Sequence, residues 1–273
     1  MSTVDTDALH TDAVDTVDGS LVSKRRGWSI PGLRATGVVG HVCAAVLAVA
    51  VLVAVIGPWI APHDPDATNL RFAYVGRYEY HYLGFDGQGR DILSRLLVGA
   101  RTSLLGPLIV VVLSMLLGVV IAITTAWLGG RVDRFASACL DVLFAFPGVR
   151  LAILASVVWG AGLAAASVAL SIAYMPYIAR VVRGAALRER TRDYVAALEV
   201  QGIQAWVICV RHIARNLLPL ISAQAAILFG YAMVDLAAIS YIGLGVQPPQ
   251  ADWGVMVSTG QSGVLQGYPM EAA

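Results

Sequence analysis

Long runs of apolar residues constrain the fold of this chain more than any other feature of its sequence. Five runs of about 20 residues are each long enough to cross a bilayer core that is ~30 Å thick. They cover residues 38–60, 104–127, 135–158, 163–182 and 217–242. Hydrophobic residues make up 58% of the 273 residues and charged residues only 14%. The sequence therefore predicts an all-α integral membrane protein, built as a helical bundle.

Basic residues predict how these spans are oriented. Residues 1–34 form a polar tail that is expected to be disordered, and a basic cluster at residues 24–26 precedes the first span. The positive-inside rule then predicts a cytoplasmic N-terminus. The loop 61–99 becomes external, and the Arg-rich loop 183–216 returns to the cytoplasm. Residues 35–273 are expected to form one transmembrane domain.

Three ionisable residues fall within the predicted spans, namely Asp141, Arg150 and Asp235. Ionisable groups in hydrocarbon are costly, so each is expected to form a structural pair or to line a substrate pathway. Arg150 should face the bundle or a wet cavity and pair with an acid. Asp235 in another span is the preferred partner. Asp141 is the alternative, although about 13 Å of helical rise separates it from Arg150.

Motifs for chemistry are missing from the sequence. There is no G-x-x-x-x-G-K-[ST] phosphate loop, no H-E-x-x-H and no G-x-S-x-G. The histidines are dispersed along the chain, and the cysteines lie far apart in apolar contexts, so no metal site is expected. The net charge of +1 creates no field that would attract nucleic acid. We expect no catalytic residue, metal or cofactor in this chain.

Four segments carry more specific detail. They read LGFDGQGRDILSRLLVGARTSL at 83–104, DR at 133–134 continuing to LDVLFAFP at 140–147, DYVAALEVQG at 193–202 with RHIARN at 211–216, and ISYIGLGVQPP at 239–249 with DWGVM at 252–256. Together they resemble the C-type inner-membrane permease of bacterial ABC importers for oligopeptides and dipeptides, in the peptide and nickel family. The resemblance covers roughly residues 35–262.

The segments also predict local structure. The first is expected to form an interfacial amphipathic helix whose arginine heads reach water. Pro147 should kink the third span. Residues 243–267 are too polar to span, and their glycines and prolines predict non-helical backbone near the external face. Members of the family normally continue to a further membrane helix, so its absence predicts a shortened C-terminus.

The third segment is similar to the cytoplasmic loop through which these permeases dock on an ATPase. A short helix should end at Gly202 in a left-handed conformation, and a second helix should begin beyond it. The resemblance assigns coupling to Tyr194, Ala196, Ala197, Glu199, Gly202, Arg211 and His212. Ala196 stands where the family has glutamate, and Arg215 where it has proline. Glu199, three residues further along the same helix, is expected to supply the missing charge.

The resemblance also implies partners. They are a homologous permease chain that completes a heterodimer, two ATP-binding subunits or one fused ATPase that hold ATP and Mg²⁺, and an extracytoplasmic substrate-binding protein. The expected location is the bacterial plasma membrane, and the expected substrate is a peptide. Dipeptides, oligopeptides, glutathione and nickel chelates all remain open.

Two other classes of function remain as alternatives. Half of a secondary transporter would have broken spans and ion ligands at the membrane midplane. A membrane-embedded enzyme would need clustered titratable groups in facing spans. ATPase chains that co-purify with the protein would distinguish an ABC permease from both.

Overall fold

The computed structural model describes residues 38–268, so the predicted tail at residues 1–34 lies outside the described part. The chain divides into two compact units, Met1–Leu47 and Ala48–Ala273. In the first unit the described residues form the beginning of a helix. The packing contacts that follow all lie within the second unit.

Helices make up the regular structure of residues 38–268, which confirms the predicted all-α class. The α-helices are α1 (Val38–Ile60), α2 (Ile92–Leu128), α3 (Gly130–Phe144), α4 (Gly148–Trp159), α5 (Leu163–Arg190), α6 (Asp193–Val200), α7 (Ala205–Val207), α8 (Ala214–Tyr241) and α9 (Trp253–Leu265). A 3-10 turn, η2 (Leu70–Phe72), lies between α1 and α2, and a π-helical turn, η3 (Ile208–Ile213), joins α7 to α8.

Four stretches of the described residues are long and apolar enough to cross a membrane. They are Gly40–Ile60, Ile92–Leu128, Leu163–Arg190 and Ala205–Tyr241. The bent pair α3 and α4 adds a fifth if the two helices count as one span. If α3 and α4 are counted as one span, the number of spans agrees with the five predicted from the sequence, although several boundaries differ.

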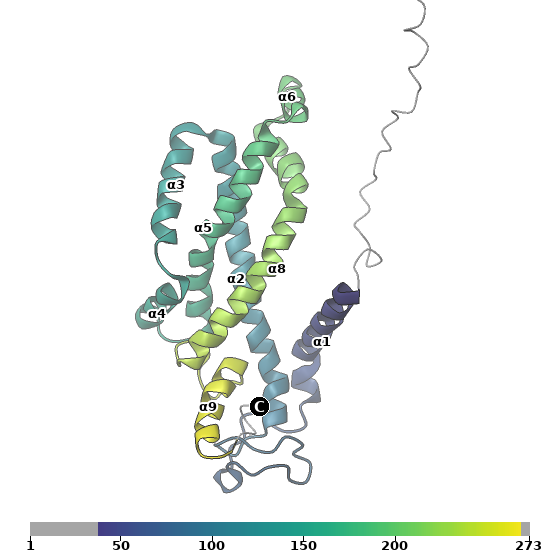
Figure 1. The fold of residues 1–273 in the computed structure, drawn as a ribbon, viewed down its shortest axis with the longest axis vertical. Helices are drawn as coiled ribbons and strands as arrows, with labels where there is room; N and C mark the ends of the chain where they lie inside the picture. Colours follow the sequence, from purple (N-terminus) through teal and green to yellow (C-terminus); the bar gives the residue numbers. More distant parts are fainter. Residues whose placement is uncertain (1–37, 269–273) are drawn as a thin grey trace, which may run out of the picture. The chain divides into compact units, whose positions relative to one another are not determined.

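Three long helices, α2, α5 and α8, form the centre of the bundle (Figure 1). Their core includes Val111 of α2, Ile178 and Val182 of α5, and Leu228 of α8, all buried. Gly118 of α2 faces Ile178 so closely that an added Cβ would lie 2.9 Å from the Ile178 Cβ. Small residues of this kind let membrane helices pack closely. Close packing is needed in a bilayer because apolar lipid provides little hydrophobic driving force for helix association.

The predicted third span is broken rather than merely kinked. The α3 helix ends at Phe144, α4 begins at Gly148, and the two axes differ by 81°. Pro147 is in an extended conformation with ψ of 133° and immediately precedes α4. Proline has no backbone N–H and also disfavours helical geometry at the residue before it, so the α3 helix stops here.

The first segment does not form the separate amphipathic helix that the sequence predicted. Residues 92–104 are the first turns of α2, a continuous helix of 37 residues that is about 55 Å long. Arg95 does not reach water, since it is 1% exposed and donates to the carbonyl oxygens of Pro65 at 3.0 Å and Pro249 at 3.2 Å. Because α2 begins at Ile92, the connection after α1 ends at Asp91, before the predicted boundary at residue 99.

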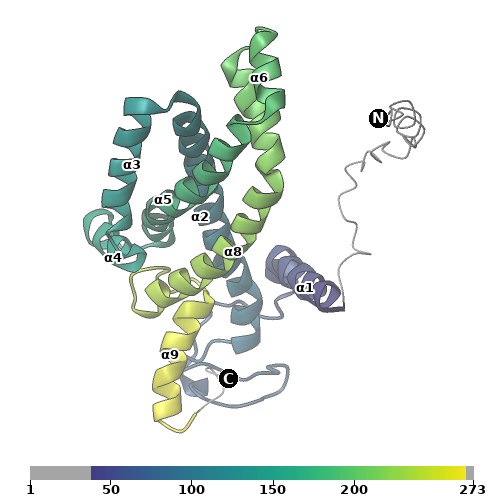
Figure 2. The ribbon, with the colours of Figure 1, turned by 45° about the horizontal axis from the view of Figure 1, so that its top comes forward.

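The α9 helix is a further difference from the prediction. Residues 243–252 are non-helical as expected, but Trp253–Leu265 forms a helix of 13 residues, too short to span a bilayer. Asp252 starts this helix by accepting hydrogen bonds from the backbone N–H groups of Gly254 and Val255. Figure 2 shows α9 next to the connection between α1 and α2.

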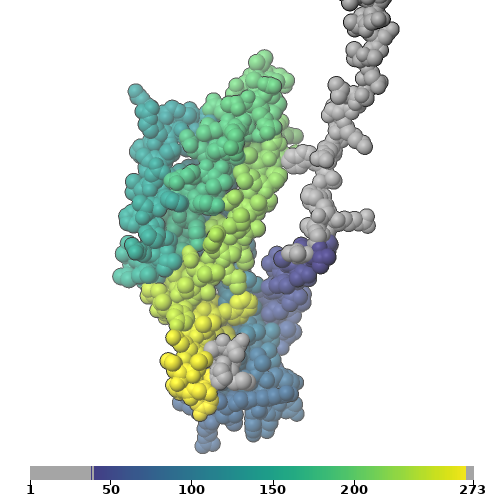
Figure 3. Space-filling view, viewed as in Figure 1, coloured from purple at the N-terminus to yellow at the C-terminus, as the bar shows by residue number. Residues whose placement is uncertain are grey.

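The two polar ends of the second unit lie far apart. The α6 helix is at one end, and residues 61–91 with α9 are at the other (Figure 1). The space-filling view shows the same separation, with the green α6 segment at the top and the blue connection at the bottom (Figure 3). This is the arrangement expected if the loops 61–99 and 183–216 face opposite sides of a membrane.

Candidate functional site

The base of α6 is fixed by a buried carboxylate on α5. Glu189 is 7% exposed, and its Oε1 accepts hydrogen bonds from the Tyr194 hydroxyl at 2.9 Å and the Asn216 amide at 2.8 Å. Its Oε2 pairs with the Arg192 Nε at 3.0 Å. A buried carboxylate is stable only when its lone pairs are satisfied in this way. Burial and the hydrogen bond to Glu189 raise the pKa of Tyr194, so its hydroxyl remains a donor.

This network joins three helices, because Glu189 lies in the last turn of α5, Tyr194 in α6 and Asn216 in the first turn of α8. Tyr194 was among the residues predicted from the sequence, whereas Glu189 was not. Nothing in the local sequence distinguishes Glu189 from the exposed charges around it. Its role depends on α8 returning to α5, which only the tertiary structure shows.

The α6 helix presents the predicted coupling residues to solvent. Val195 packs into the core at 1% exposure, whereas Ala196, Ala197 and Glu199 are exposed and Val200 is 89% exposed. Apolar exposure continues beyond the helix with Trp206 and Val210, each 65% exposed. We call Ala196, Ala197, Glu199, Val200, Trp206 and Val210 the α6 surface. It is a mixed apolar and acidic surface at the end of the bundle.

Gly202 has the predicted left-handed conformation, with φ of +75°. The Gly202 N–H donates to the Glu199 carbonyl at 2.9 Å, and the Ile203 N–H donates to the Leu198 carbonyl at 3.1 Å. These two bonds form a Schellman motif, which satisfies the last carbonyls of a helix. The predicted second helix begins at Ala205, and its π-helical turn holds Arg211 and His212.

Part of the basic charge near this end is structural. The Arg190 guanidinium donates to the carbonyl oxygens of Ala126 at 2.9 Å and of Trp127, and lies 4.9 Å from the centre of the Trp127 ring. It thereby caps the carbonyls that α2 leaves unpaired at its end. Arg183 forms a bidentate pair with Asp133 of α3, with both contacts at 2.5 Å.

A cavity of about 400 Å³ lies beside the break between α3 and α4. Its lining includes Phe144, Phe146, Tyr174, Tyr177, Tyr231 and Asp235. The Tyr174 hydroxyl donates to the Asp235 Oδ2 at 2.6 Å, which joins α5 to α8 across the cavity wall. We call this the aromatic cavity. It combines several aromatic faces with one carboxylate, a surface suited to apolar and cationic groups.

The predicted Arg150–Asp235 pair is wrong for this chain. Asp235 bonds to Tyr174, and Asp141 pairs with Arg180 at 2.6 Å. Arg150 is exposed on α4 and forms no ion pair within residues 38–268. The prediction assumed one continuous third span, whereas the 81° break redirects α4 after Pro147. Asp141 on α3 and Arg150 on α4 therefore have different surroundings.

The first sequence segment folds around buried charges. The Asp86 carboxylate accepts from the backbone N–H groups of Gln88 and Arg90 at 2.8 Å each, and from the Arg90 Nε at 2.6 Å. Asp86 and Arg90 are both buried. The histidines of this connection are not dispersed in space, because the rings of His63 and His81 stack with their centres 3.9 Å apart.

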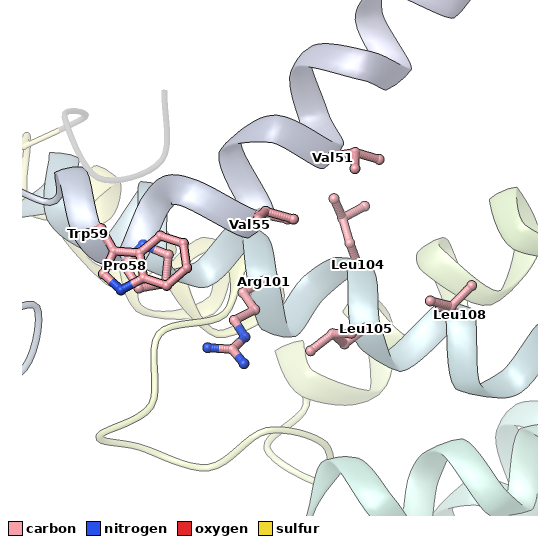
Figure 4. A pocket seen from close by; sticks show the side chains of 9 residues that line it. Val51, Val55, Pro58, Trp59, Arg101, Leu104, Leu105 and Leu108 are labelled. Atoms are coloured by element: carbon pink, nitrogen blue, oxygen red, sulfur yellow. The ribbon is translucent and has the colours of Figure 1, made fainter.

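A second hollow of about 440 Å³ lies along α1 and α2. In Figure 4, Val51 and Val55 of α1 lie near Leu104 of α2, with Arg101 below them. Its lining is apolar apart from the Arg101 side chain, so it offers no constellation for chemistry. Such a surface suits lipid chains or a neighbouring helix.

Two known protein families together match nearly all of the described residues. The family described as binding-protein-dependent transport system inner membrane component matches residues 93–269. The N-terminal TM domain of oligopeptide transport permease C matches residues 39–76. These two matches cover the spans, the α6 segment and the aromatic cavity.

Individual relatives point the same way. The chain is 35% identical over 222 residues to a probable D,D-dipeptide transport system permease protein of Escherichia coli K12, covering 81% of this chain and 74% of the relative. It is 39% identical over 215 residues to a putative peptide transport system permease protein of Brucella suis biovar 1, covering 79% and 72%. It is 34% identical over 219 residues to a glutathione transport system permease protein of Escherichia coli O1:K1, covering 79% and 71%.

The helical architecture and these matches agree on a multi-pass protein of the bacterial inner membrane. The chain belongs to the family of binding-protein-dependent transport system inner membrane components, as a permease of the peptide ABC importer type.

Proposed function

We propose that this chain forms half of the pathway of an ATP-driven peptide importer and that its α6 surface receives the motion of the ATPase. The observation that carries the proposal is that α6 has an exposed surface on which a partner can dock, while its base is held to the rest of the bundle. Val200 is 89% exposed, while Glu189 holds the same short helix to α5 and α8 through Tyr194 and Asn216.

A docking helix transmits motion only if it does not bend at its base. The Glu189 network and the buried Val195 fix one side of α6 to the bundle. The Schellman motif at Gly202 fixes its other end. A force that the ATPase exerts on the α6 surface then moves α5 and α8 together. These two helices carry Tyr174 and Asp235 of the aromatic cavity. This connection gives the coupling a physical route.

The proposal includes the partners expected of such a subunit. A homologous permease chain completes the pathway, and two ATP-binding subunits or one fused ATPase bind the α6 surface. ATP and Mg²⁺ bind to those subunits, and this chain has no catalytic role. An extracytoplasmic binding protein delivers the substrate at the end formed by residues 61–91 and α9. The N-terminus is then cytoplasmic.

The aromatic cavity is this chain's contribution to the substrate path. Asp235 offers a carboxylate that suits the ammonium group of a peptide, and Tyr174 holds it in place at 2.6 Å. Asp141 and Arg150 belong to the same broken span and supply further charge near the path. The relatives named for peptides, D,D-dipeptides and glutathione support a peptide substrate.

A charge placed on the α6 surface tests the docking role. The Val200→Asp variant adds a carboxylate to an apolar contact, so we expect co-purification of the ATPase subunits and substrate-stimulated ATP hydrolysis both to fall. Leu70→Asp is the matched control for retention of the ATPase subunits, because Leu70 is 76% exposed in η2 at the opposite end. If Val200→Asp retains the ATPase subunits as fully as Leu70→Asp, the α6 surface is not the docking site.

A further inference from the structure

Three metal-binding side chains meet at the end of the protein opposite α6. They are His63, His81 and Asp91, and within residues 38–268 their ligand atoms all lie within 4.8 Å of one another. The His81 Nδ1 lies 2.9 Å from the Asp91 Oδ1, and the His63 Nδ1 lies 3.9 Å from the Asp91 Oδ2. His63 follows α1 and Asp91 immediately precedes α2, so the cluster joins the two ends of the connection.

These separations are close to those of ligands that share one ion. Two atoms bound at ~2.1 Å are about 3.0 Å apart at a right angle and about 3.4 Å apart at a tetrahedral angle. The His81–Asp91 distance of 2.9 Å, which is that of a hydrogen bond, lies just below this range. The His63–Asp91 distance of 3.9 Å requires a closure of about half an ångström. The His63 ring must also turn out of its stack on His81, because an imidazole nitrogen binds an ion in the plane of its ring.

One ligand atom of the cluster lacks a hydrogen bond. The His63 Nδ1 is buried and has no hydrogen-bond partner in the described part of the chain. Buried polar atoms are nearly always paired, and an exception points to a water or an ion at that position. The His63 side chain as a whole is 33% exposed, so an ion could enter from solvent and keep a water ligand. The unpaired nitrogen is thus an observation independent of the clustering.

The carboxylate is held in position by neighbouring groups. Asp91 Oδ2 accepts from the backbone N–H of Ser94 at 2.8 Å and from its hydroxyl at 2.6 Å. The Ser94 hydroxyl oxygen in turn accepts from the His63 backbone N–H at 3.1 Å. Outer contacts of this kind orient ligands in metal sites.

We propose that His63, His81 and Asp91 form a site for a divalent transition-metal ion, with Zn²⁺ as its representative, that closes the connection between α1 and α2. Two imidazoles favour Zn²⁺ and its neighbours over Mg²⁺ and Ca²⁺, which prefer all-oxygen sites. Three protein ligands and one water complete a four-coordinate ion. The ion is a resident structural group and lies apart from the aromatic cavity.

The site explains how a long connection with little regular structure keeps one shape. Residues 61–91 contain one helical turn, η2, and two isolated β-bridges, one of which pairs Tyr78 with His81. An ion bound at residues 63, 81 and 91 ties its beginning, middle and end together. Closing such a loop stabilises the folded form by reducing the freedom of the open chain.

Zinc titration of the whole permease complex tests the site. The complex is purified with a histidine-free tag, stripped with a chelator and titrated with Zn²⁺ by calorimetry. We expect one tight Zn²⁺ per chain of this permease, and more than about tenfold weaker binding in His63→Gln and in His81→Gln. Glutamine keeps the size and polarity but is a poor ligand. His41→Gln in α1 is the matched control and should bind as the parent does.

Two further measurements keep the outcome unambiguous. Retention of the ATPase subunits shows that each variant has assembled, so a loss of Zn²⁺ binding reports the site itself. Co²⁺ replacing Zn²⁺ should give visible absorption that disappears in His81→Gln. Absence of stoichiometric Zn²⁺, or equal binding in the parent and both glutamine variants, would overturn the proposal and leave a hydrogen-bonded cluster. Neither result depends on transport or on the α6 surface.

Discussion

Replacing Gly202 with valine should weaken the coupling between ATP hydrolysis and transport. Gly202 has φ of +75°, and an added Cβ would meet nothing within 4 Å. The cost of the substitution is therefore conformational, and a left-handed position costs an L-residue roughly 1–2 kcal/mol. That energy lowers the population of the native turn by a factor of about 5 to 30. Relaxation of the turn breaks the two Schellman bonds and displaces the α6 surface.

Substrate-stimulated ATP hydrolysis and peptide uptake in proteoliposomes measure this effect. Gly202→Val should lose stimulation, whereas Gly202→Asn should keep most of it, because asparagine tolerates the left-handed region. Gly160→Val is the strain control, since Gly160 has φ of +88° and also faces open space, but lies between α4 and α5. If an assembled Gly202→Val complex is stimulated like the parent, or if asparagine is as harmful as valine, the turn does not set the coupling.

Two more predictions concern single charges. Glu199 is exposed and forms no ion pair within residues 38–268, so Glu199→Gln should remove a contact with the ATPase worth about 1.5–3 kcal/mol and weaken its association by roughly tenfold or more. Adding Ala196→Glu should restore it, and unchanged binding of Glu199→Gln would show that Glu199 does not replace the missing charge. Asp235→Asn keeps an oxygen for Tyr174 but removes the charge, so uptake should fall while assembly is unchanged. Equal uptake by this variant would exclude Asp235 from the path.

The features that sequence predicts well are those set by local chemistry. Apolar runs of sufficient length indicate spanning helices, and α5 and α8 begin within a few residues of the predicted spans. Gly202 could be assigned a left-handed conformation because few residues other than glycine adopt it. The matched families agree with the segment-based resemblance.

The features that sequence missed depend on contacts between distant residues. Glu189 and Asn216 are 27 residues apart, and His63 and Asp91 are separated by a connection with little regular structure. No periodic pattern in the sequence indicates that such positions are in contact. Arg95 was expected at the surface because arginine usually is exposed, but two backbone carbonyls from separate parts of the chain enclose it. Burial of a charge follows from the full set of its partners, which a local pattern does not contain.

The break after α3 and the aromatic cavity are structurally linked, because residues of the break line the cavity. Backbone outside a helix has unpaired polar groups, which at membrane depth must be buried in protein or face a wet cavity. The residues of the break meet this requirement, since Phe146 and Pro147 line the cavity together with Tyr174 and Asp235. The proline that ends α3 thus leaves a space beside the half-buried Asp235 carboxylate, where we propose that a polar substrate passes.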